Sequence, residues 1–253
     1  MDNIKLKKYV VTGAVKHGIG EAVTRRLLAE GNIVVGTYEK DLEKEAISMR
    51  GEFPSLTLAE VDHSSRQSLL SFTSGLSGEE LNGLVNVEMF FAMEDVENFD
   101  HDLWDKSLAI NLSAPNILAH ELKSKLTNGS SIVTVTSTEA FIGSFGASAY
   151  AATKAAVHNL TKTLANNLGD RDIRVNVVAP GWIGGVMDTD EVFNMSRRIT
   201  PLRRLGEPEE VASVVWFLLS DESTFVNGTV ITVDGGYSGV DTISKFEFQA
   251  ENK

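Results

Sequence analysis

The amino-acid sequence predicts an α/β protein with a single domain, built on one doubly wound parallel sheet of about seven strands with helices on both faces. Short β-branched runs alternate with helix-length segments along the chain. These runs are almost continuously apolar, as expected of parallel strands that are buried on both faces. A length of 253 residues suits one α/β unit with a sizeable core.

The strand pattern recurs seven times. The predicted strands are Tyr9–Thr12, Ile33–Thr37, Leu56–Val61, Gly83–Val87, Ile132–Thr136, Val175–Ala179 and Val230–Val233. Each has the length and the β-branched content of a buried strand. Since helix-length segments separate most of them, the strands are joined by crossover connections, which gives a parallel sheet.

Four segments have the spacing of helices. The first carries Ile19, Val23 and Leu27 on one stripe and ends at Gly31. The last opens with proline at a first-turn position, followed by two glutamates. The other three predicted helices are Leu103–Leu126, Tyr150–Leu168 and Pro208–Ser220, and the last of these is the one that opens with proline.

The composition excludes several classes of function. A formal net charge of −12 and a sequence pI near 4.9 argue against partners such as nucleic acid or anionic lipid. The absence of cysteine excludes disulfides, thiolate metal sites and cysteine nucleophiles. The most apolar segment, Val211–Leu219, is far shorter than the roughly 20 residues that span a bilayer. We therefore expect a cytoplasmic protein that binds small molecules or copies of itself.

The first turn between strand and helix is rich in glycine. It runs Thr12-Gly13-Ala14-Val15-Lys16-His17-Gly18-Ile19-Gly20. Glycines let a backbone approach a pyrophosphate, and the amides at the start of the next helix hold its charge. Tight turns also need glycine for steric reasons alone, so the position of this motif, after the first strand, is what favours nucleotide binding.

A second group of residues has the chemistry of proton transfer. Tyr150 and Lys154 are four residues apart in a helical pattern, so their side chains share a face. A nearby ammonium lowers the pKa of a phenol, which then acts as a general acid or base. Each of these residues also has an ordinary structural explanation when it is taken alone. A tyrosine and a lysine are common on a solvated helix face, Ser137 can be a capping hydroxyl, and Asn111 can be an outward-facing amide.

Together these motifs make the chain resemble the classical short-chain dehydrogenase/reductases, especially the 3-oxoacyl-acyl-carrier-protein reductases. The resemblance extends from Thr12 to Gly236. Its most specific parts are Ser137 thirteen residues before Tyr150, and the stretch Tyr150-Ala-Ala-Thr-Lys154. Two further motifs are Arg174-Val-Asn-Val-Val-Ala-Pro180-Gly181 and Pro201-Leu-Arg-Arg-Leu-Gly206, the latter with Asp234-Gly-Gly236.

The resemblance implies a Rossmann-like fold and specific catalytic roles. Tyr150 would exchange a proton with the substrate oxygen, and Ser137 would hydrogen-bond the same oxygen. Lys154 would lower the pKa of Tyr150 and bind the nicotinamide ribose. Asn111 would hold a water that links Lys154 to solvent. The hydride chemistry would belong to NAD(P). No metal is expected, because the histidines lack ligand spacing.

The resemblance also implies a set of residues that contact the coenzyme. These are Gly13, Lys16, His17, Gly18, Ile19, Gly20, Thr37, Tyr38, Asp62, Asn86, Tyr150, Lys154, Pro180, Gly181 and Ile183. Asp62 has an alternative interpretation as an acid at the start of a helix. Thr37 with Lys16 or His17 would receive the phosphate of NADP, whereas Glu39 would repel it unless it points away. The balance favours NADP slightly.

Three features depart from the family pattern. Four residues separate the first two glycines instead of three, which predicts a longer turn. Glu88 and Met89 replace a small pair beside the expected adenosine ribose, adding bulk and negative charge. Gly184 and Gly185 stand where the family commonly has a threonine that bonds the carboxamide, with Thr189 as an available substitute.

The predicted domain spans residues 1–237 and includes a substrate lid at about 184–206. The expected wall, Ala140–Gly146, and the lid carry Phe141, Ile142, Phe145, Val186, Met187, Val192, Phe193 and Met195. Such surfaces suit an apolar or mixed substrate. By analogy with the family, a homotetramer or dimer is expected. The tail, 238–253, is either disordered or reaches a neighbouring subunit through Phe246 and Phe248.

The predicted function is the interconversion of a ketone and a secondary alcohol, with a 3-oxoacyl thioester or similar small ketone as the specific candidate. Two alternatives stay open. The first is oxidation of a polyol or sugar alcohol. The second is a dinucleotide-sensing or scaffold protein without turnover, for which Glu88, Met89 and the longer turn argue; the presence of all four catalytic residues argues against it.

Overall fold

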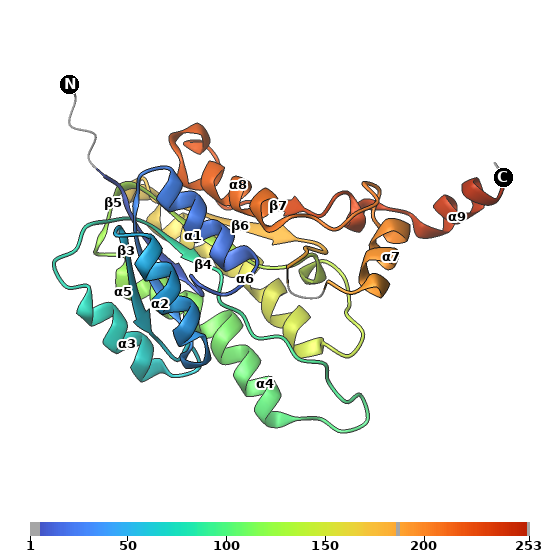
Figure 1. The fold of residues 1–253 in the computed structure, drawn as a ribbon, viewed down its shortest axis with the longest axis horizontal. Coiled ribbons are helices and arrows are strands. Elements are labelled where there is room, and N and C mark those ends of the chain that lie inside the picture. Colours follow the sequence, from blue (N-terminus) through green and yellow to red (C-terminus); the bar gives the residue numbers. More distant parts are fainter. Residues whose placement is uncertain (1–5, 186–187, 252–253) are drawn as a thin grey trace.

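The computed structural model describes residues 6–185 and 188–251, and it contains one seven-stranded parallel sheet (Figure 1). The strand order is β3-β2-β1-β4-β5-β6-β7. The strands are β1 Lys8–Thr12, β2 Ile33–Tyr38, β3 Leu56–Glu60, β4 Leu81–Asn86, β5 Leu126–Val135, β6 Arg174–Pro180 and β7 Val230–Val233. The predicted fold class and strand number are confirmed.

Helices cover both faces of the sheet. In the described ranges they are α1 Ile19–Ala29, α2 Glu43–Glu52, α3 Arg66–Gly75, α4 His101–Ser107, α5 Ala114–Leu122, α6 Ser148–Leu168, α7 Asp190–Ile199, α8 Pro208–Leu219 and α9 Thr242–Glu251. One apolar core lies between the sheet and α1, α2 and α8, and a second lies between the sheet and α3, α5 and α6. Two buried faces explain the continuous apolar strand runs.

The order of the strands in the sheet determines where a ligand-binding site is expected. β1 pairs in parallel with both β2 and β4, so the chain winds outward in opposite directions from β1. Ligands of doubly wound sheets bind at the carboxyl ends of the strands where this reversal occurs. The loops that follow β1 and β4 meet at this point, and they carry the glycine turn and Glu88.

One predicted boundary was wrong. The helix expected over Leu103–Leu126 consists of α4, a π-helical segment Leu108–Ser113 and α5, and α5 ends at Leu122. Leu126 instead begins β5, where it pairs with Leu81. Since Leu126 is four residues after Leu122, its apolar side chain fits the helical period, but it is buried as a strand residue.

The tail after β7 contains a helix. α9 follows the last strand and projects away from the body of the molecule (Figure 1). Its apolar side chains Ile243, Phe246 and Phe248 are exposed. The reach of this tail toward a neighbouring subunit stays a prediction. Among the described residues, no helix is both long and apolar enough to cross a membrane.

Candidate active site

The glycine turn has the geometry that its sequence predicts. Gly13 and Gly18 have φ values of 63° and 92°, a region that favours glycine. A Cβ atom at Gly20 would overlap the carbonyl oxygen of Gly13. Gly18 lies at the N-cap of α1, and Ile19 begins the helix. The turn thus leads into a helix N-terminus, where backbone amides and the helix dipole favour an anion.

Ser137, Tyr150 and Lys154 form the candidate catalytic group. Ser137 lies just after β5, while Tyr150 and Lys154 lie one turn apart on α6. Lys154 is 2% exposed; its Nζ donates to the carbonyl of Val135 at 3.3 Å and lies 5.4 Å from the centre of the Tyr150 ring. Ser137 is hydrogen-bonded to the Tyr150 side chain. The three predicted residues therefore lie together.

Burial shifts both titrating groups toward their neutral forms. It raises the pKa of Tyr150 to about 12, an effect that the hydrogen bond from Ser137 opposes and the charge of Glu139 increases. Burial lowers the pKa of Lys154 to about 7, against the attraction of Glu88. The expected lowering of the Tyr150 pKa by Lys154 is not among these effects, and a lysine with a pKa of about 7 is only half protonated at pH 7.

Asn111 connects the loop after β4 to the catalytic helix. It lies in the π-helical segment, a feature often found at functional sites. Its Oδ1 accepts from the Phe90 amide at 2.8 Å, and its Nδ2 donates to the Phe90 carbonyl at 2.9 Å and to Thr153 Oγ1 at 3.3 Å. The side chain positions the loop next to Lys154, and the expected water relay stays a prediction.

Glu88 lies directly against the glycine turn. Its Oε1 pairs with Lys16 Nζ at 2.6 Å and accepts from the Met89 amide at 3.0 Å. Lys16 Nζ also donates to the Met89 carbonyl at 3.0 Å. A Cβ atom on Gly13 would lie 2.9 Å from Glu88 Oε2. The extra negative charge anticipated from the sequence is thus compensated by a lysine of the longer turn.

Several predicted coenzyme residues face inward. Thr37 and Tyr38 are buried, and Thr37 Oγ1 lies 3.0 Å from His63 Nε2. Asn86 is buried and donates to Thr134 Oγ1 at 3.1 Å. The Thr37 hydroxyl is therefore engaged inside the fold by His63 and by the amide of Gly13 in the glycine turn, from which it accepts at 3.3 Å.

Two other predicted residues lie at the surface. Asp62 Oδ1 accepts from the amide and the hydroxyl of Ser64, at 2.8 and 2.6 Å, in a turn that precedes Ser65, the N-cap residue of α3. The side chain of His17 is 77% exposed and its Nδ1 lies 3.3 Å from Glu21 Oε2. The contact of Asp62 with the coenzyme stays a prediction, and the exposed side chain of His17 is accessible to a ligand.

The segment after β6 meets the lid. Pro180 is buried, and a Cβ atom on Gly181 would lie 2.6 Å from Asp234 Cβ. Ile183 forms an isolated parallel bridge with Gly206. Thr189 Oγ1 accepts from the Val192 amide and caps α7, so its hydroxyl serves the lid helix. Ile183 therefore lies at the base of the lid, and its contact with the coenzyme stays a prediction.

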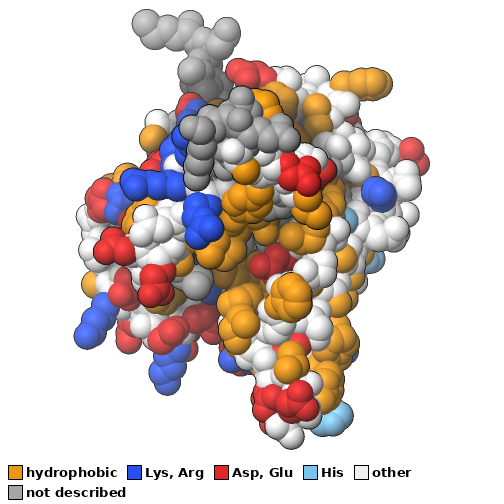
Figure 2. Space-filling model, turned by 90° about the vertical axis from the view of Figure 1, so that its right-hand side faces the viewer, with side chains coloured by type: hydrophobic (Ala, Val, Ile, Leu, Met, Phe, Trp, Pro, Cys, Tyr) orange, Lys and Arg blue, Asp and Glu red, His pale blue; other side chains and the backbone are white. Residues whose placement is uncertain are grey.

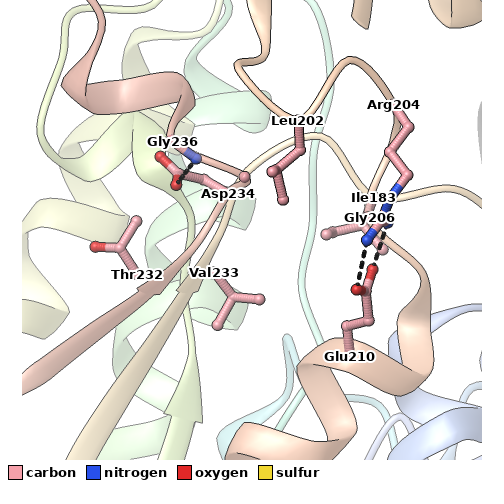
Figure 3. A pocket seen from close by; sticks show the side chains of 10 residues that line it. Ile183, Leu202, Arg204, Gly206, Glu210, Thr232, Val233, Asp234 and Gly236 are labelled. Atoms are coloured by element: carbon pink, nitrogen blue, oxygen red, sulfur yellow. Dashed lines mark hydrogen bonds and ion pairs between the residues drawn. The ribbon is translucent and has the colours of Figure 1, made fainter.

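A cavity of about 410 Å³ adjoins Ile183 (Figure 3). An ion pair between Arg204 Nη1 and Glu210 Oε2, at 2.7 Å, forms one side of it. Its lining residues are Ile183, Leu202, Arg204, Gly206, Glu210, Thr232, Val233, Asp234, Gly235 and Gly236. None of the candidate catalytic group lines this cavity, so it belongs to the base of the lid.

Apolar side chains from the predicted wall and lid are exposed. Figure 2 shows hydrophobic side chains gathered around a hollow on one face of the molecule. The exposed large apolar residues include Phe91, Phe141, Ile142, Phe145, Phe193 and Met195. The ring of Phe91 contacts Tyr150 edge to face at 5.1 Å between centroids, which joins this surface to the catalytic group. Val186 and Met187 lie outside the described residues.

Sequence reasoning missed two features of the site. Glu139, two residues after Ser137, has a buried Oε2 without a hydrogen-bond partner among the described residues. Its position two residues after Ser137 in the sequence could have indicated that it lies near the candidate catalytic group. The contact of His63 Nδ1 with Glu39 Oε1, at 3.0 Å, gave no such signal because the two residues follow different strands.

Replacing Glu139 with glutamine is expected to make alcohol oxidation less dependent on alkaline pH. The charge of Glu139 raises the pKa of Tyr150, so its removal lowers that pKa and leaves more phenolate at any given pH. We expect the rising limb of kcat/KM for oxidation, measured between pH 7 and 10, to shift to lower pH by about half a unit. The exposed Glu97→Gln is the control; an unshifted limb in Glu139→Gln would contradict the assignment.

Comparisons with known proteins agree with this geometry. A family model described as Enoyl-(Acyl carrier protein) reductase matches residues 13–238. Dehydrogenase/reductase SDR family member 4 of Homo sapiens is 34% identical over 245 residues, which cover 90% of this chain and 87% of that protein. A 3-oxoacyl-[acyl-carrier-protein] reductase of Thermotoga maritima is 35% identical over 244 residues, or 91% and 97% of the two chains.

A solved structure is similar over almost the whole chain. It is a short-chain dehydrogenase of Burkholderia cenocepacia J2315 in complex with NADP, with a TM-score of 0.86 and 29% sequence identity. The match covers 92% of this chain and 98% of that one.

Proposed function

This chain belongs to the short-chain dehydrogenase/reductase family of oxidoreductases, and from that premise we propose that it interconverts a ketone and a secondary alcohol. The observation that carries the proposal is the buried Lys154 amine beside the Tyr150 ring, with Ser137 hydrogen-bonded to the phenol. A phenol and a hydroxyl this close can each donate one hydrogen bond to the same carbonyl oxygen once the serine hydroxyl turns from the phenol to the substrate.

The residues present fit a bound NAD(P). The glycine turn opens a helix N-terminus for the pyrophosphate, and Lys154, which lies beside Tyr150, is near enough to Lys16 of that turn for their charges to interact. When bound, the nicotinamide supplies or accepts the hydride. Tyr150 then gives its proton to the substrate oxygen in reduction and takes it back in oxidation, while Ser137 orients that oxygen. Lys154 holds the coenzyme and exchanges protons with Tyr150.

Our preferred coenzyme is NADP. The similar Burkholderia cenocepacia enzyme is described in complex with NADP. Glu39, the residue expected to repel the additional phosphate, is turned toward His63, whose amide and Nδ1 lie 3.2 and 3.0 Å from its Oε1. His17 presents an exposed side chain on the turn, where a phosphate can be paired.

The preferred substrate is a 3-oxoacyl thioester or a similar small ketone. The similar Thermotoga maritima protein is named as a reductase of this substrate class. The exposed apolar residues around the candidate catalytic group suit an acyl chain better than a free sugar. We further propose a homo-oligomer, tested by the native mass in solution.

A second candidate is oxidation of a polyol or sugar alcohol. Glu139 favours it, because its Oε2 is buried beside the candidate catalytic group and lacks a donor among the described residues. A substrate hydroxyl next to the reacting carbon would supply that donor.

Coenzyme binding and substrate class are tested in two measurements. In the first, titration of the protein with NADPH and NADH is followed by nicotinamide fluorescence, and we expect NADPH to bind at least about fivefold more tightly, close to 1 kcal/mol. In the second, kcat/KM is measured for 3-oxoacyl thioesters, simple ketones and polyols in both directions.

The results separate the alternatives. A higher kcat/KM for polyols with NAD would replace the reductase proposal with the second candidate. Binding of either coenzyme without turnover of any substrate would identify a sensing or scaffold protein. Absence of binding of both coenzymes would overturn the proposed function.

A further inference from the structure

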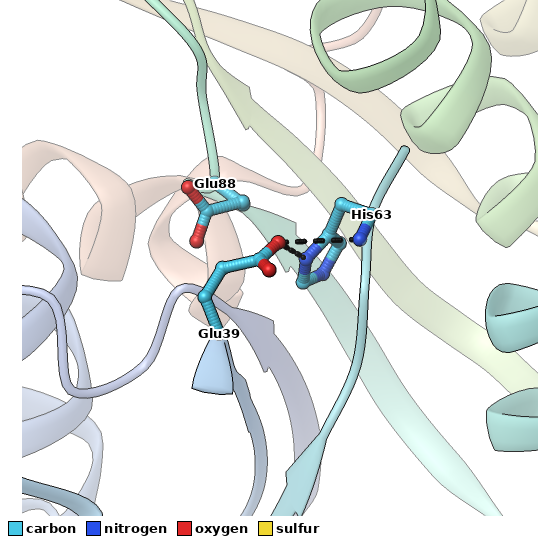
Figure 4. Close-up of side chains that lie close together, drawn as sticks. All are labelled: Glu39, His63 and Glu88. Atoms are coloured by element: carbon cyan, nitrogen blue, oxygen red, sulfur yellow. Dashed lines mark hydrogen bonds and ion pairs between the residues drawn. The ribbon is translucent and has the colours of Figure 1, made fainter. Parts of the chain in front are cut away.

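Three side chains with metal-binding chemistry meet beside the glycine turn (Figure 4). Glu39 follows β2, His63 lies after β3 and Glu88 lies after β4. One ligand atom from each of them lies within 4.8 Å of the other two. The closest pair is Glu39 Oε1 and His63 Nδ1, at 3.0 Å. The candidate catalytic group includes none of these residues.

The cluster is buried and holds an unsatisfied acceptor. The side chains of His63 and Glu88 are 1% and 5% exposed. Glu88 Oε1 accepts from Lys16 and from the Met89 amide, whereas Oε2 is buried and has no hydrogen-bond partner in the part of the chain that the structure describes. A buried carboxylate oxygen without a donor is costly, and a cation can remove that cost.

The charges also favour a cation. Glu39 and Glu88 carry two negative charges and Lys16 supplies one positive charge, so the cluster keeps one excess negative charge when His63 is neutral. Lys16 contacts only the Oε1 side of Glu88, and its own side chain is 38% exposed. Lys16 therefore leaves the Oε2 side of the carboxylate open.

We propose that Glu39, His63 and Glu88 form a binding site for a divalent transition-metal ion, with Zn²⁺ as the preferred occupant and water completing the coordination. Two carboxylates and one imidazole are a ligand set that suits Zn²⁺, whereas Mg²⁺ and Ca²⁺ take oxygen ligands. Donor atoms about 2.1 Å from a tetrahedral Zn²⁺ lie about 3.4 Å from each other. The spacing of Glu39 and His63 is already close to this value.

Neighbouring groups hold the ligands in place. The separations between the ligand atoms are at most 4.8 Å, so none has to shorten by more than about 1.4 Å to reach the spacing around a tetrahedral ion. Rotation of a glutamate side chain supplies a movement of this size. His63 Nε2 lies 3.0 Å from Thr37 Oγ1. With the metal on Nδ1, the ring proton resides on Nε2 and is donated to Thr37, the outer-shell contact typical of metal-bound histidine.

The site is tested by isothermal titration calorimetry of the full chain, freed of metal with EDTA and of dinucleotide, using ZnCl₂ and MgCl₂ as titrants. We expect one Zn²⁺ per chain and binding of Mg²⁺ at least 100-fold weaker. His63→Ala and Glu88→Gln each should weaken Zn²⁺ binding at least tenfold. Titration with CoCl₂ should add a visible absorption band of a tetrahedral Co²⁺ site, absent in both variants.

Control variants show whether a change in Zn²⁺ affinity comes from the proposed ligands. His101→Ala removes an exposed histidine on α4 that has acidic neighbours, and it should leave Zn²⁺ affinity unchanged. Circular dichroism checks the fold of each variant; if His63→Ala is unfolded, the isosteric Glu88→Gln decides. Absence of Zn²⁺ binding, or wild-type affinity in the folded variants, overturns the site. NADPH affinity is measured separately, so loss of coenzyme binding would contradict the proposed function and not the metal site.

Discussion

Tyr150→Phe is expected to reduce kcat for ketone reduction by about 10²- to 10⁴-fold, the range typical of a lost general acid. The substitution removes only the hydroxyl. The edge-to-face contact between the ring and Phe91 remains, so the local packing is preserved. The measurement is ketone-dependent oxidation of NADPH at pH 7, together with coenzyme affinity by nicotinamide fluorescence, which should change by less than about threefold.

Tyr237→Phe is the matched control, because Tyr237 lies in a short turn after β7 and has no place in the candidate catalytic group. Its kcat should equal that of the wild type. Equal rates in Tyr150→Phe and the wild type would remove Tyr150 from the mechanism.

Lys154→Met is expected to lower kcat/KM at least about 100-fold and, at the same time, to stabilise the protein at neutral pH. Burial lowers the pKa of Lys154 to about 7, well below the usual value near 10.5, so the folded state binds fewer protons than the unfolded state between these two pH values. The stability of the wild type therefore rises with pH across this window. Methionine has a similar length and no charge to desolvate.

The gain in unfolding free energy from Lys154→Met should be on the order of a few kcal/mol at pH 7 and smaller at pH 9. Urea unfolding at the two pH values measures it. Lys162→Met, an exposed position on the same helix, should change neither activity nor the pH dependence of stability. A gain of equal size at pH 7 and pH 9 would show that the amine of Lys154 does not titrate in this range.

The sheet was predictable because each buried strand has a continuous apolar run, and the candidate catalytic group was predictable because its spacing along α6 fixes a shared face. Packing between distant segments was not predictable. Nothing in the sequence indicates that Lys16 reaches Glu88, or that Asn111 binds the backbone of Phe90, since these contacts join separate loops. The start of β5 was missed because Leu126 continues the period of the preceding helix.

The pKa shifts escaped sequence reasoning for a related reason. The proximity of Tyr150 and Lys154 predicts mutual stabilisation of their charged forms, but the degree of burial decides the sign. Burial depends on the loop after β4 and on the segment after β5, whose positions no local pattern gives. Likewise, Glu39, His63 and Glu88 come together only through the winding order of the strands.

The π-helical segment Leu108–Ser113 makes this region sensitive to changes in chain length. One residue accounts for about 100° of rotation in an α-helix. Deleting a residue from this wide turn would turn Asn111 away from Phe90 while leaving its neighbours in regular helix. We therefore expect insertions and deletions in this segment to leave the protein folded but to abolish its catalytic activity. In any redesign, the length of this turn matters more than its composition.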